Sequence, residues 1–305
     1  MLIRKEYKCK KYHLLMVQKY SKISPTAVFC ARMRAKQDIL FAKEIVEMID
    51  TKYSKLIEDL PDYGNTLNSE SDFIPFIEGR YYSLNNVLGG INNAFIVELA
   101  SGLSPRSLVF LDKEDIIYVE TDLRKLIKIK EQILKDIIKK KNLKSQNLFF
   151  MSINPLKKED MDKIGEIYLE KGKNKKLIII HEGFLMYLNK EEKKVFRNNI
   201  KYIFNKYARN GLWLTSDFSR IKRHPNEPKG KENIRDKISK FTKRDFDYFE
   251  SKEETKKFLR DAGFKQKIIS NENIISLLIK KKSLQFNKTA ILKSAKEYRI
   301  WKIEL

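Results

Sequence analysis

The stretch FIVELASGLSPRSLVF, Phe95 to Phe110, decides the fold class that this sequence predicts. Its apolar run ends at Glu98, passes through the small residues Ala100 to Gly102, and resumes after a proline and an arginine. A strand that ends in small residues brings its backbone close to a ligand, and glycine adopts backbone conformations that other residues avoid. A tight strand-to-helix turn without a ligand explains the same residues. Both interpretations stay open here, because the turn lacks the complete G-x-G-x-x-G pattern.

A second predicted strand, IIYVETDL, ends with two acidic residues, Glu120 and Asp122. They follow the first strand by about twenty residues, the spacing at which dinucleotide-binding folds place an acidic side chain on the ribose hydroxyls. The alternative is an acidic residue that caps a helix beginning near Leu123.

From Phe95 onward, short apolar strands alternate with longer amphipathic stretches. The predicted strands are Phe95 to Ala100, Ile116 to Thr121, Asn147 to Ile153, Lys176 to Glu182, Gly211 to Phe218, Lys265 to Ser270 and Tyr298 to Leu305. Between the second and third, LRKLIKIKEQILKDIIKKKNLK places an apolar stripe on one helix face and lysines opposite. The alternation predicts an α/β fold, a doubly wound and mostly parallel sheet covered by helices on both faces.

Ligands of such sheets bind beyond the carboxyl ends of the strands, where the strand order reverses. The candidate residues are therefore those at the predicted strand ends: Glu98 through Gly102, Glu120 through Leu123, Ser152 through Leu156, His181 through Gly183, and Ser216 with Asp217.

Composition limits the class of protein. The chain has 305 residues, of which 42% are hydrophobic, and this suits one large α/β domain or such a domain with an appendage. A formal net charge of +23 favours anionic partners such as nucleic acid or an acidic membrane surface. A lysine-rich composition that merely solvates the surface is the preferred explanation, because lysines are spread along the whole chain.

Only two cysteines occur, Cys9 and Cys30, too few for a disulfide scaffold and without metal-ligand spacing to histidine. We therefore expect no metal site and a reducing, cytoplasmic location. No stretch approaches the ~20 apolar residues of a membrane helix, so we expect neither a secreted nor a membrane-spanning protein.

Several stretches occur in the order and spacing seen in one enzyme family. They are TAVFCARMRA, GRYYSLNNVL, FIVELASGLSPRSLVF, YVETDL, HEGFLMYLNKEE and DYFESKEETKKFLRDAGF. With them the sequence resembles the leucine carboxyl methyltransferase family of S-adenosylmethionine-dependent O-methyltransferases, in particular its bacterial polyketide O-methyltransferase-like branch. The resemblance extends from Thr26 to Phe264, and VELASGLSPR followed by EGFLMYL is its most specific part.

The resemblance implies a class I methyltransferase fold, a Rossmann-like sandwich whose seven-stranded sheet has an antiparallel last strand. It also implies that S-adenosylmethionine is the cofactor. Arg80 would clamp the methionyl carboxylate, Asp122 would hold the ribose hydroxyls, and Glu182 would lie beside the methionyl amine. The implied cofactor-binding residues are Arg80, Glu98, Ala100, Ser101, Gly102, Asp122, Leu123, Asn154 and Glu182.

Two positions depart from the family pattern. Ala100 stands where the family usually has its first glycine, and Asn154 stands where it usually has an aspartate. Both replacements are compatible with cofactor binding, because Ala100 is still small and the Asn154 amide can still accept a hydrogen bond from the adenine amino group.

The sequence contains no convincing catalytic dyad. The candidates are His181, Tyr187 and Asp217, and the preferred alternative for His181 is a structural histidine, because strand alternation puts it on the sheet face opposite Glu182. Methyl transfer is an in-line displacement, which needs mainly alignment. A carboxylate acceptor is already ionised near neutral pH and needs no general base, whereas a hydroxyl acceptor needs one.

The expected organisation is a helical cap over 1–79 and a methyltransferase domain over 80–305, with a basic, proline-interrupted lid at about 219–248. The expected acceptor is a small molecule with an anionic group. An RNA-directed methyltransferase and a non-catalytic descendant of the fold are the alternative functions. The chain reads HEGF after the fourth strand and shows no motif with aromatic residues for base stacking, so a nucleic-acid partner is not the preferred interpretation.

Overall fold

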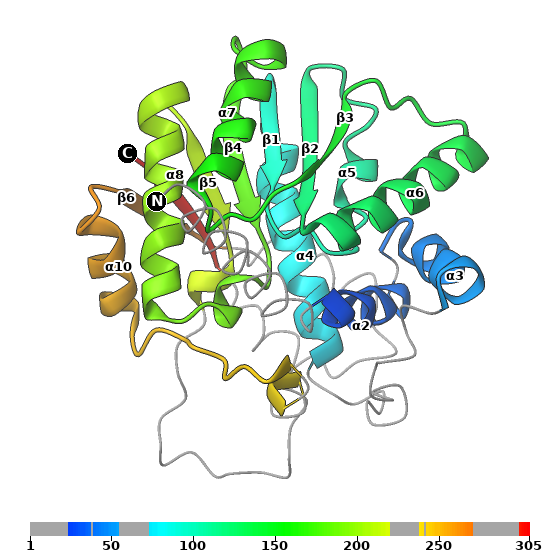
Figure 1. Ribbon diagram of the computed structural model, residues 1–305, viewed down its shortest axis with the longest axis horizontal. Helices are drawn as coiled ribbons and strands as arrows, with labels where there is room; N and C mark the ends of the chain where they lie inside the picture. Colours follow the sequence, from blue (N-terminus) through cyan, green and yellow to red (C-terminus); the bar gives the residue numbers. More distant parts are fainter. Residues whose placement is uncertain (1–23, 38, 55–72, 220–237, 241, 271–298) are drawn as a thin grey trace, which may run out of the picture.

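A single sheet organises the molecule. The computed structural model describes residues 24–37, 39–54, 73–219, 238–240, 242–270 and 299–305. Within them the sheet contains seven strands in the order β3-β2-β1-β4-β5-β7-β6 (Figure 1). The strands are β1 (Ala94–Glu98), β2 (Ile116–Asp122), β3 (Leu148–Ser152), β4 (Lys176–His181), β5 (Leu212–Thr215), β6 (Lys265–Ile269) and β7 (Ile300–Glu304).

Strand direction follows the prediction. Neighbouring strands from β3 through β5 pair in parallel, whereas β7 is antiparallel to both β5 and β6. Each predicted strand overlaps an observed one, so the predicted fold class, a mostly parallel seven-stranded sheet with an antiparallel last strand, is confirmed. The strand order reverses between β1 and β4, which places a ligand crevice at the carboxyl ends of these two strands.

Strand side chains alternate between two apolar layers. On β4, Ile178 and Ile180 belong to one buried cluster, and Leu177 and Ile179 belong to the other. The first cluster is completed by helices α4 (Phe73–Gly89) and α6 (Arg124–Lys141), and the second by α7 (Lys158–Lys171), α8 (Lys190–Tyr207) and α10 (Lys252–Arg260). Burial on both faces explains why the central strands β1, β4 and β5 are mostly apolar, whereas the edge strand β6 contains polar and exposed residues.

Two helices lie in the described part of the N-terminal stretch, where a helical cap is expected. They are α2 (Ser24–Ala35) and α3 (Ala42–Lys52). Helix α2 packs on α3 and α4, and α3 packs on α6, so that α2 lies beside the ends of the parallel strands (Figure 1). Helix α4 runs without a break across the boundary expected between residues 79 and 80.

Most of the predicted lid, 219–248, lies outside the described residues, which include only 219, 238–240 and 242–248 of it. None of the helices that the structure describes is both long enough and apolar enough to cross a membrane.

Candidate functional site

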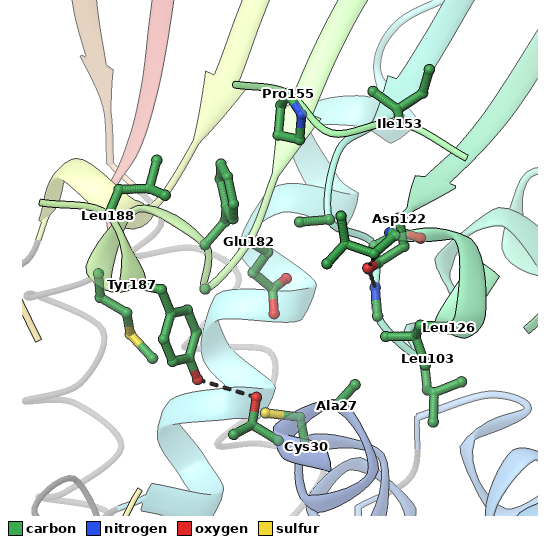
Figure 2. A pocket seen from close by; sticks show the side chains of 18 of the residues that line it. Ala27, Cys30, Leu103, Asp122, Leu126, Ile153, Pro155, Glu182, Tyr187 and Leu188 are labelled. Atoms are coloured by element: carbon green, nitrogen blue, oxygen red, sulfur yellow. Dashed lines mark hydrogen bonds between the residues drawn. The ribbon is translucent and has the colours of Figure 1, made fainter. Parts of the chain in front are cut away.

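A cleft opens where the strand order reverses. It encloses about 1170 Å³ of empty space, counted together with its open mouth, and its lining comes from the turns after β1, β2, β3 and β4, from α2 and α4, and from the 3₁₀ helix η2 (Leu185–Tyr187). Figure 2 shows Asp122 and Glu182 pointing into it from two strand ends, with Tyr187 on one side and Cys30 of α2 facing them. The cleft is thus bounded by the strand ends of the sheet and by helices α2 and α4.

The predicted cofactor-binding residues converge on this cleft with one exception. Those that line it are Arg80, Ala100, Ser101, Gly102, Asp122, Leu123, Asn154 and Glu182. Glu98 lies behind the lining and is only 1% exposed.

The turn after β1 has an unusual backbone. Ala100 and Gly102 both adopt left-handed conformations, with φ of 50° and 53°. Ser101 N–H donates to the carbonyl of Thr121 at 2.9 Å, which ties the turn to β2. A Cβ at Gly102 would lie 3.3 Å from the Cβ of Ala27, so glycine also lets α2 approach the turn closely.

Asp122 is the acidic residue that faces the cleft at the end of β2. Its Oδ2 accepts from Gly102 N–H at 2.8 Å and its Oδ1 accepts from Leu123 N–H at 2.7 Å. Burial raises the pKa of Asp122, and these two backbone hydrogen bonds oppose the shift. Helix α6 begins at Arg124 with Leu123 as its N-cap and with no side-chain capping bond, so Asp122 is not a conventional cap.

Glu120, the other acidic candidate, has a different role. It is fully buried and pairs with the equally buried Lys130 of α6, Nζ to Oε2, at 2.6 Å. Strand alternation puts residues 120 and 122 on the same face of the sheet, and their positions along the strand set them apart, because only Asp122 lies at the strand end, where the cleft begins.

Glu182 follows β4 and is held by three arginines. Its Oε1 accepts from Arg34 and from Arg80, each at 3.0 Å, and its Oε2 accepts from Arg106. Burial disfavours a charged carboxylate, but Arg80, Arg106 and Arg34 outweigh burial and lower the pKa of Glu182 to about 2. The Glu182 side chain is therefore an anion at neutral pH.

Arg106 joins Glu182 to Glu98 inside the protein. It is fully buried, contacts both carboxylates, donates to Asn85 Oδ1 at 2.6 Å, and lies 4.8 Å from the ring centroid of Tyr81. Glu98 also accepts from the Tyr118 hydroxyl at 2.6 Å. Glu98 thus supports the cleft from behind.

Three arginines and two carboxylates form one buried cluster: Arg34, Arg80 and Arg106 with Glu98 and Glu182. Arg34 is 5% exposed, and its Nε has no hydrogen-bond partner among the described residues. A buried guanidinium with a spare donor favours an anionic group of a ligand.

Asn154 lies on the side of the cleft formed by the turn after β3. Its Oδ1 accepts from Leu156 N–H at 3.0 Å, and its own N–H donates to Asp160 at 2.9 Å. The side chain therefore shapes its own turn, beside the apolar lining residues Ile153 and Pro155.

The three catalytic candidates separate into two groups. Tyr187 lines the cleft, but its hydroxyl donates to Thr26 Oγ1 at 3.2 Å and burial raises its pKa, so it stays a protonated phenol. His181 and Asp217 are bonded to each other at 3.0 Å and are absent from the lining of the cleft. His181 points away from Glu182, as strand alternation predicts.

Two arginines of the cluster were missed by sequence reasoning. Arg34 and Arg106 are 72 positions apart, and neither has an apolar or acidic neighbour pattern that indicates burial. The feature that could have indicated them is their position in TAVFCARMRA and VELASGLSPR, two of the stretches on which the family resemblance rests.

Within the described residues, no group of three or more His, Cys, Asp or Glu side chains could hold a metal ion.

Comparison with known proteins gives only distant likenesses. No protein-family model and no curated protein matches the chain. Among solved structures, an O-methyltransferase family protein from Burkholderia thailandensis matches with a TM-score of 0.47 and 11% identity over 86% of this chain and 71% of that one. A putative O-methyltransferase from Nostoc punctiforme matches with a TM-score of 0.45 and 10% identity over 87% and 70% of the two chains. Human N-acetylserotonin methyltransferase, solved with S-adenosylmethionine, matches with a TM-score of 0.42 and 10% identity over 86% and 69%. Likenesses this distant transfer neither substrate nor activity to this chain.

Proposed function

We propose that this protein is an S-adenosylmethionine-dependent O-methyltransferase and that the cleft holds the cofactor. The observation that carries the proposal is that one cleft brings together the left-handed turn at 100–102, Asp122, and the paired groups Arg34, Arg80 and Glu182. The resemblance of the sequence motifs to the leucine carboxyl methyltransferase family supports the same conclusion. The expected small-molecule acceptor belongs to this proposal too.

The residues fit the cofactor group by group. The lone pairs of Asp122 that its two backbone bonds leave free can accept from the ribose hydroxyls. The spare Nε of Arg34 and the guanidinium of Arg80 suit the methionyl carboxylate. Glu182 Oε2 accepts from Arg106 and can still accept from the methionyl amine. Ser101 Oγ is a further buried atom of the cleft lining without a partner among the described residues.

When bound, S-adenosylmethionine supplies an electrophilic methyl group attached to a sulfonium sulfur. An acceptor oxygen receives this methyl group by in-line displacement, with the sulfur as the leaving group. The protein has to align the two reactants and exclude water. Tyr187, Met186 and Leu188 form an apolar wall beside Glu182, and the Tyr187 to Thr26 hydrogen bond connects this wall to α2. These residues would enclose the acceptor.

The cleft favours an acceptor oxygen that is already ionised. Among the described lining residues, Glu182 is held as an anion by three arginines, with a pKa of about 2, which is too low for a general base. Tyr187 stays protonated, and His181 and Asp217 lie behind the wall. A carboxylate acceptor needs no base, so we propose a carboxylate in preference to a neutral alcohol.

Isothermal titration with S-adenosylmethionine, S-adenosylhomocysteine and NAD tests the proposal. We expect the first two to bind and NAD not to bind. Asp122→Ala should weaken binding of S-adenosylhomocysteine by about 1 to 3 kcal/mol, because it removes charged hydrogen bonds. The same substitution at the exposed Asp261, which pairs with Lys257 of α10, should leave the affinity unchanged.

Two results would reject the cofactor assignment. One is the absence of S-adenosylmethionine binding to protein whose circular dichroism shows it folded. The other is equal affinity of the wild type and a folded Asp122→Ala variant. A supporting result justifies a screen of carboxylic acids as methyl acceptors.

A further inference from the structure

One carboxylate behind the cleft gathers hydrogen bonds from a whole turn. Asp217, which begins the 3₁₀ helix η3 (Asp217–Ser219) after β5, accepts from the backbone N–H groups of Gly183 at 2.7 Å, Phe184 at 2.8 Å and Leu185 at 3.0 Å. His181 Nδ1 lies 3.0 Å from the same carboxylate. Successive backbone N–H groups form a concave anion-binding site, and here a side chain of the protein itself occupies it.

This turn carries one wall of the cleft. Glu182 precedes it, and the lining residues Met186 and Tyr187 follow it. Gly183 has a φ of 75°, and a Cβ there would lie 3.1 Å from the guanidinium nitrogens of Arg80. A displacement of the turn would therefore move Glu182 relative to its arginines and shift the apolar wall at the same time.

His181 supports Asp217 from inside the protein. Its ring is fully buried, with centroids 5.9 Å from Phe184, 5.3 Å from Phe196 and 5.8 Å from Trp213. Thr215 Oγ1 lies 3.2 Å from its Nδ1, and its Nε2 has no partner among the described residues. The ring lies in the aromatic layer and does not line the cleft, so it reaches the cleft through its hydrogen bond to Asp217 and through its packing on the lining residue Phe184.

We propose that Asp217 and His181 are positioning residues. They hold the turn formed by residues 182–187, and with it the apolar wall, in the geometry that binds the cofactor, and neither is a proton acceptor in catalysis. This inference rests on the proposed function. Burial opposes the charge of Asp217, but His181, Arg80 and the N–H of Leu185 outweigh burial and hold the pKa of Asp217 well below its ordinary value. Asp217 therefore remains the anion that the N–H donors require.

The first test substitutes Asp217 by asparagine, whose amide hydrogens would face N–H donors. We expect the Kd for S-adenosylhomocysteine to rise about 10- to 100-fold, as for loss of charge-assisted hydrogen bonds. Asp162→Asn is the matched control, because Asp162 also accepts several bonds, from Tyr202, Lys206 and Tyr207, but away from the cleft. The control should lower thermal stability and leave the Kd unchanged.

A second pair of variants separates the hydrogen bond of His181 from its packing. His181→Asn keeps a donor near the position of Nδ1, whereas His181→Phe keeps the ring in its aromatic surroundings and removes the donor. We expect the Kd to stay within about 3-fold of wild type for the first and to rise about 10-fold for the second. Equal effects of the two variants, or the reverse order, overturn the positioning role. This pair decides the question if Asp217→Asn fails to fold.

Hydrogen exchange gives a readout that needs no ligand. The amides of Gly183, Phe184 and Leu185 should exchange faster in Asp217→Asn than in wild type, and at the wild-type rate in Asp162→Asn. A wild type that does not bind S-adenosylhomocysteine rejects the proposed function. Unchanged exchange and unchanged Kd in a folded Asp217→Asn variant reject the positioning role alone.

Discussion

Ala100 shows how one methyl group affects the turn at residues 100–102, after β1. Its φ of 50° lies in the left-handed region, where an L-residue costs about 1–2 kcal/mol relative to the right-handed conformation. Glycine does not incur this cost, because it has no Cβ. The departure at Ala100 thus stores strain in the turn and does not block it, because Ala100 lines the cleft as a small residue.

Replacing Ala100 by glycine should therefore stabilise the protein. We expect a gain of about 1 kcal/mol, which for a chain of this size corresponds to a rise of about 2 °C in the melting temperature. Ala31→Gly, in the right-handed helix α2, is the matched control and should lower the melting temperature, because glycine costs about 1 kcal/mol in a helix interior. Differential scanning calorimetry measures both. A lower melting temperature for Ala100→Gly would contradict the strain argument.

At the scale of elements, helix α6 and strand β2 are linked by a buried ion pair. Lys130 and Glu120 are both fully buried and lie 2.6 Å apart, and Lys130 Nζ also lies 3.4 Å from the carbonyl of Ser101. Lys130 occupies a position on the apolar stripe of α6, between Leu126 and Leu134. The pair therefore connects helix α6, strand β2 and the turn at residues 100–102.

Removing one member of this pair should be costly. Lys130→Met leaves Glu120 buried without its counter-charge, and we expect a loss of about 3–5 kcal/mol in the free energy of unfolding. The double variant Lys130→Met with Glu120→Leu should recover most of the loss, because two apolar side chains replace two buried charges. Lys135→Met, at the exposed pair with Glu131, should change stability by about 0.5 kcal/mol or less. Urea denaturation measures each value. If the single variant Lys130→Met were as stable as the double variant with Glu120→Leu, this account of the ion pair would be refuted.

At the scale of the whole molecule, the charged cluster joins segments that are far apart in sequence. Arg34 belongs to α2, Arg80 to α4, Arg106 to α5 (Arg106–Val109), and all of them meet Glu182 after β4. Folding therefore gathers three positive charges around one carboxylate. The ionisation of Glu182 contributes to the stability of the assembled fold, because its pKa is depressed to about 2.

This pairing predicts acid sensitivity. A carboxyl group whose pKa is lower in the folded state than in the unfolded state contributes its full stability above the unfolded value of about 4.3, and loses it as pH falls toward the folded value. For Glu182 the loss falls between about pH 4.5 and pH 2 and amounts to about 3 kcal/mol. Urea denaturation across this range should show a steeper loss for wild type than for Glu182→Gln. Identical slopes would contradict the depressed pKa.

The fold could be predicted because its signals are local. The strands, the amphipathic helix α6 and the small-residue turn each follow from patterns within a few residues, and all of them occur as expected. Of the candidate site, the cleft residues at strand ends could be predicted from the rule that parallel sheets bind ligands there. The sequence could not predict the roles of Glu98, Glu120 and Lys130, because the partner of each comes from another helix or strand.

By itself, the sequence determined the α/β class, the succession of strands and the segments that meet at the cleft, because apolar periodicity and small-residue turns act over short distances. Only the tertiary structure decided that Asp122 and not Glu120 faces the cleft, that Arg34 and Arg106 join Arg80 around Glu182, and that His181 and Asp217 stand behind the wall. The physical reason is that the partner of a buried charge is chosen by packing between elements. Glu182 finds partners 76, 102 and 148 positions away, and no local pattern encodes such distances.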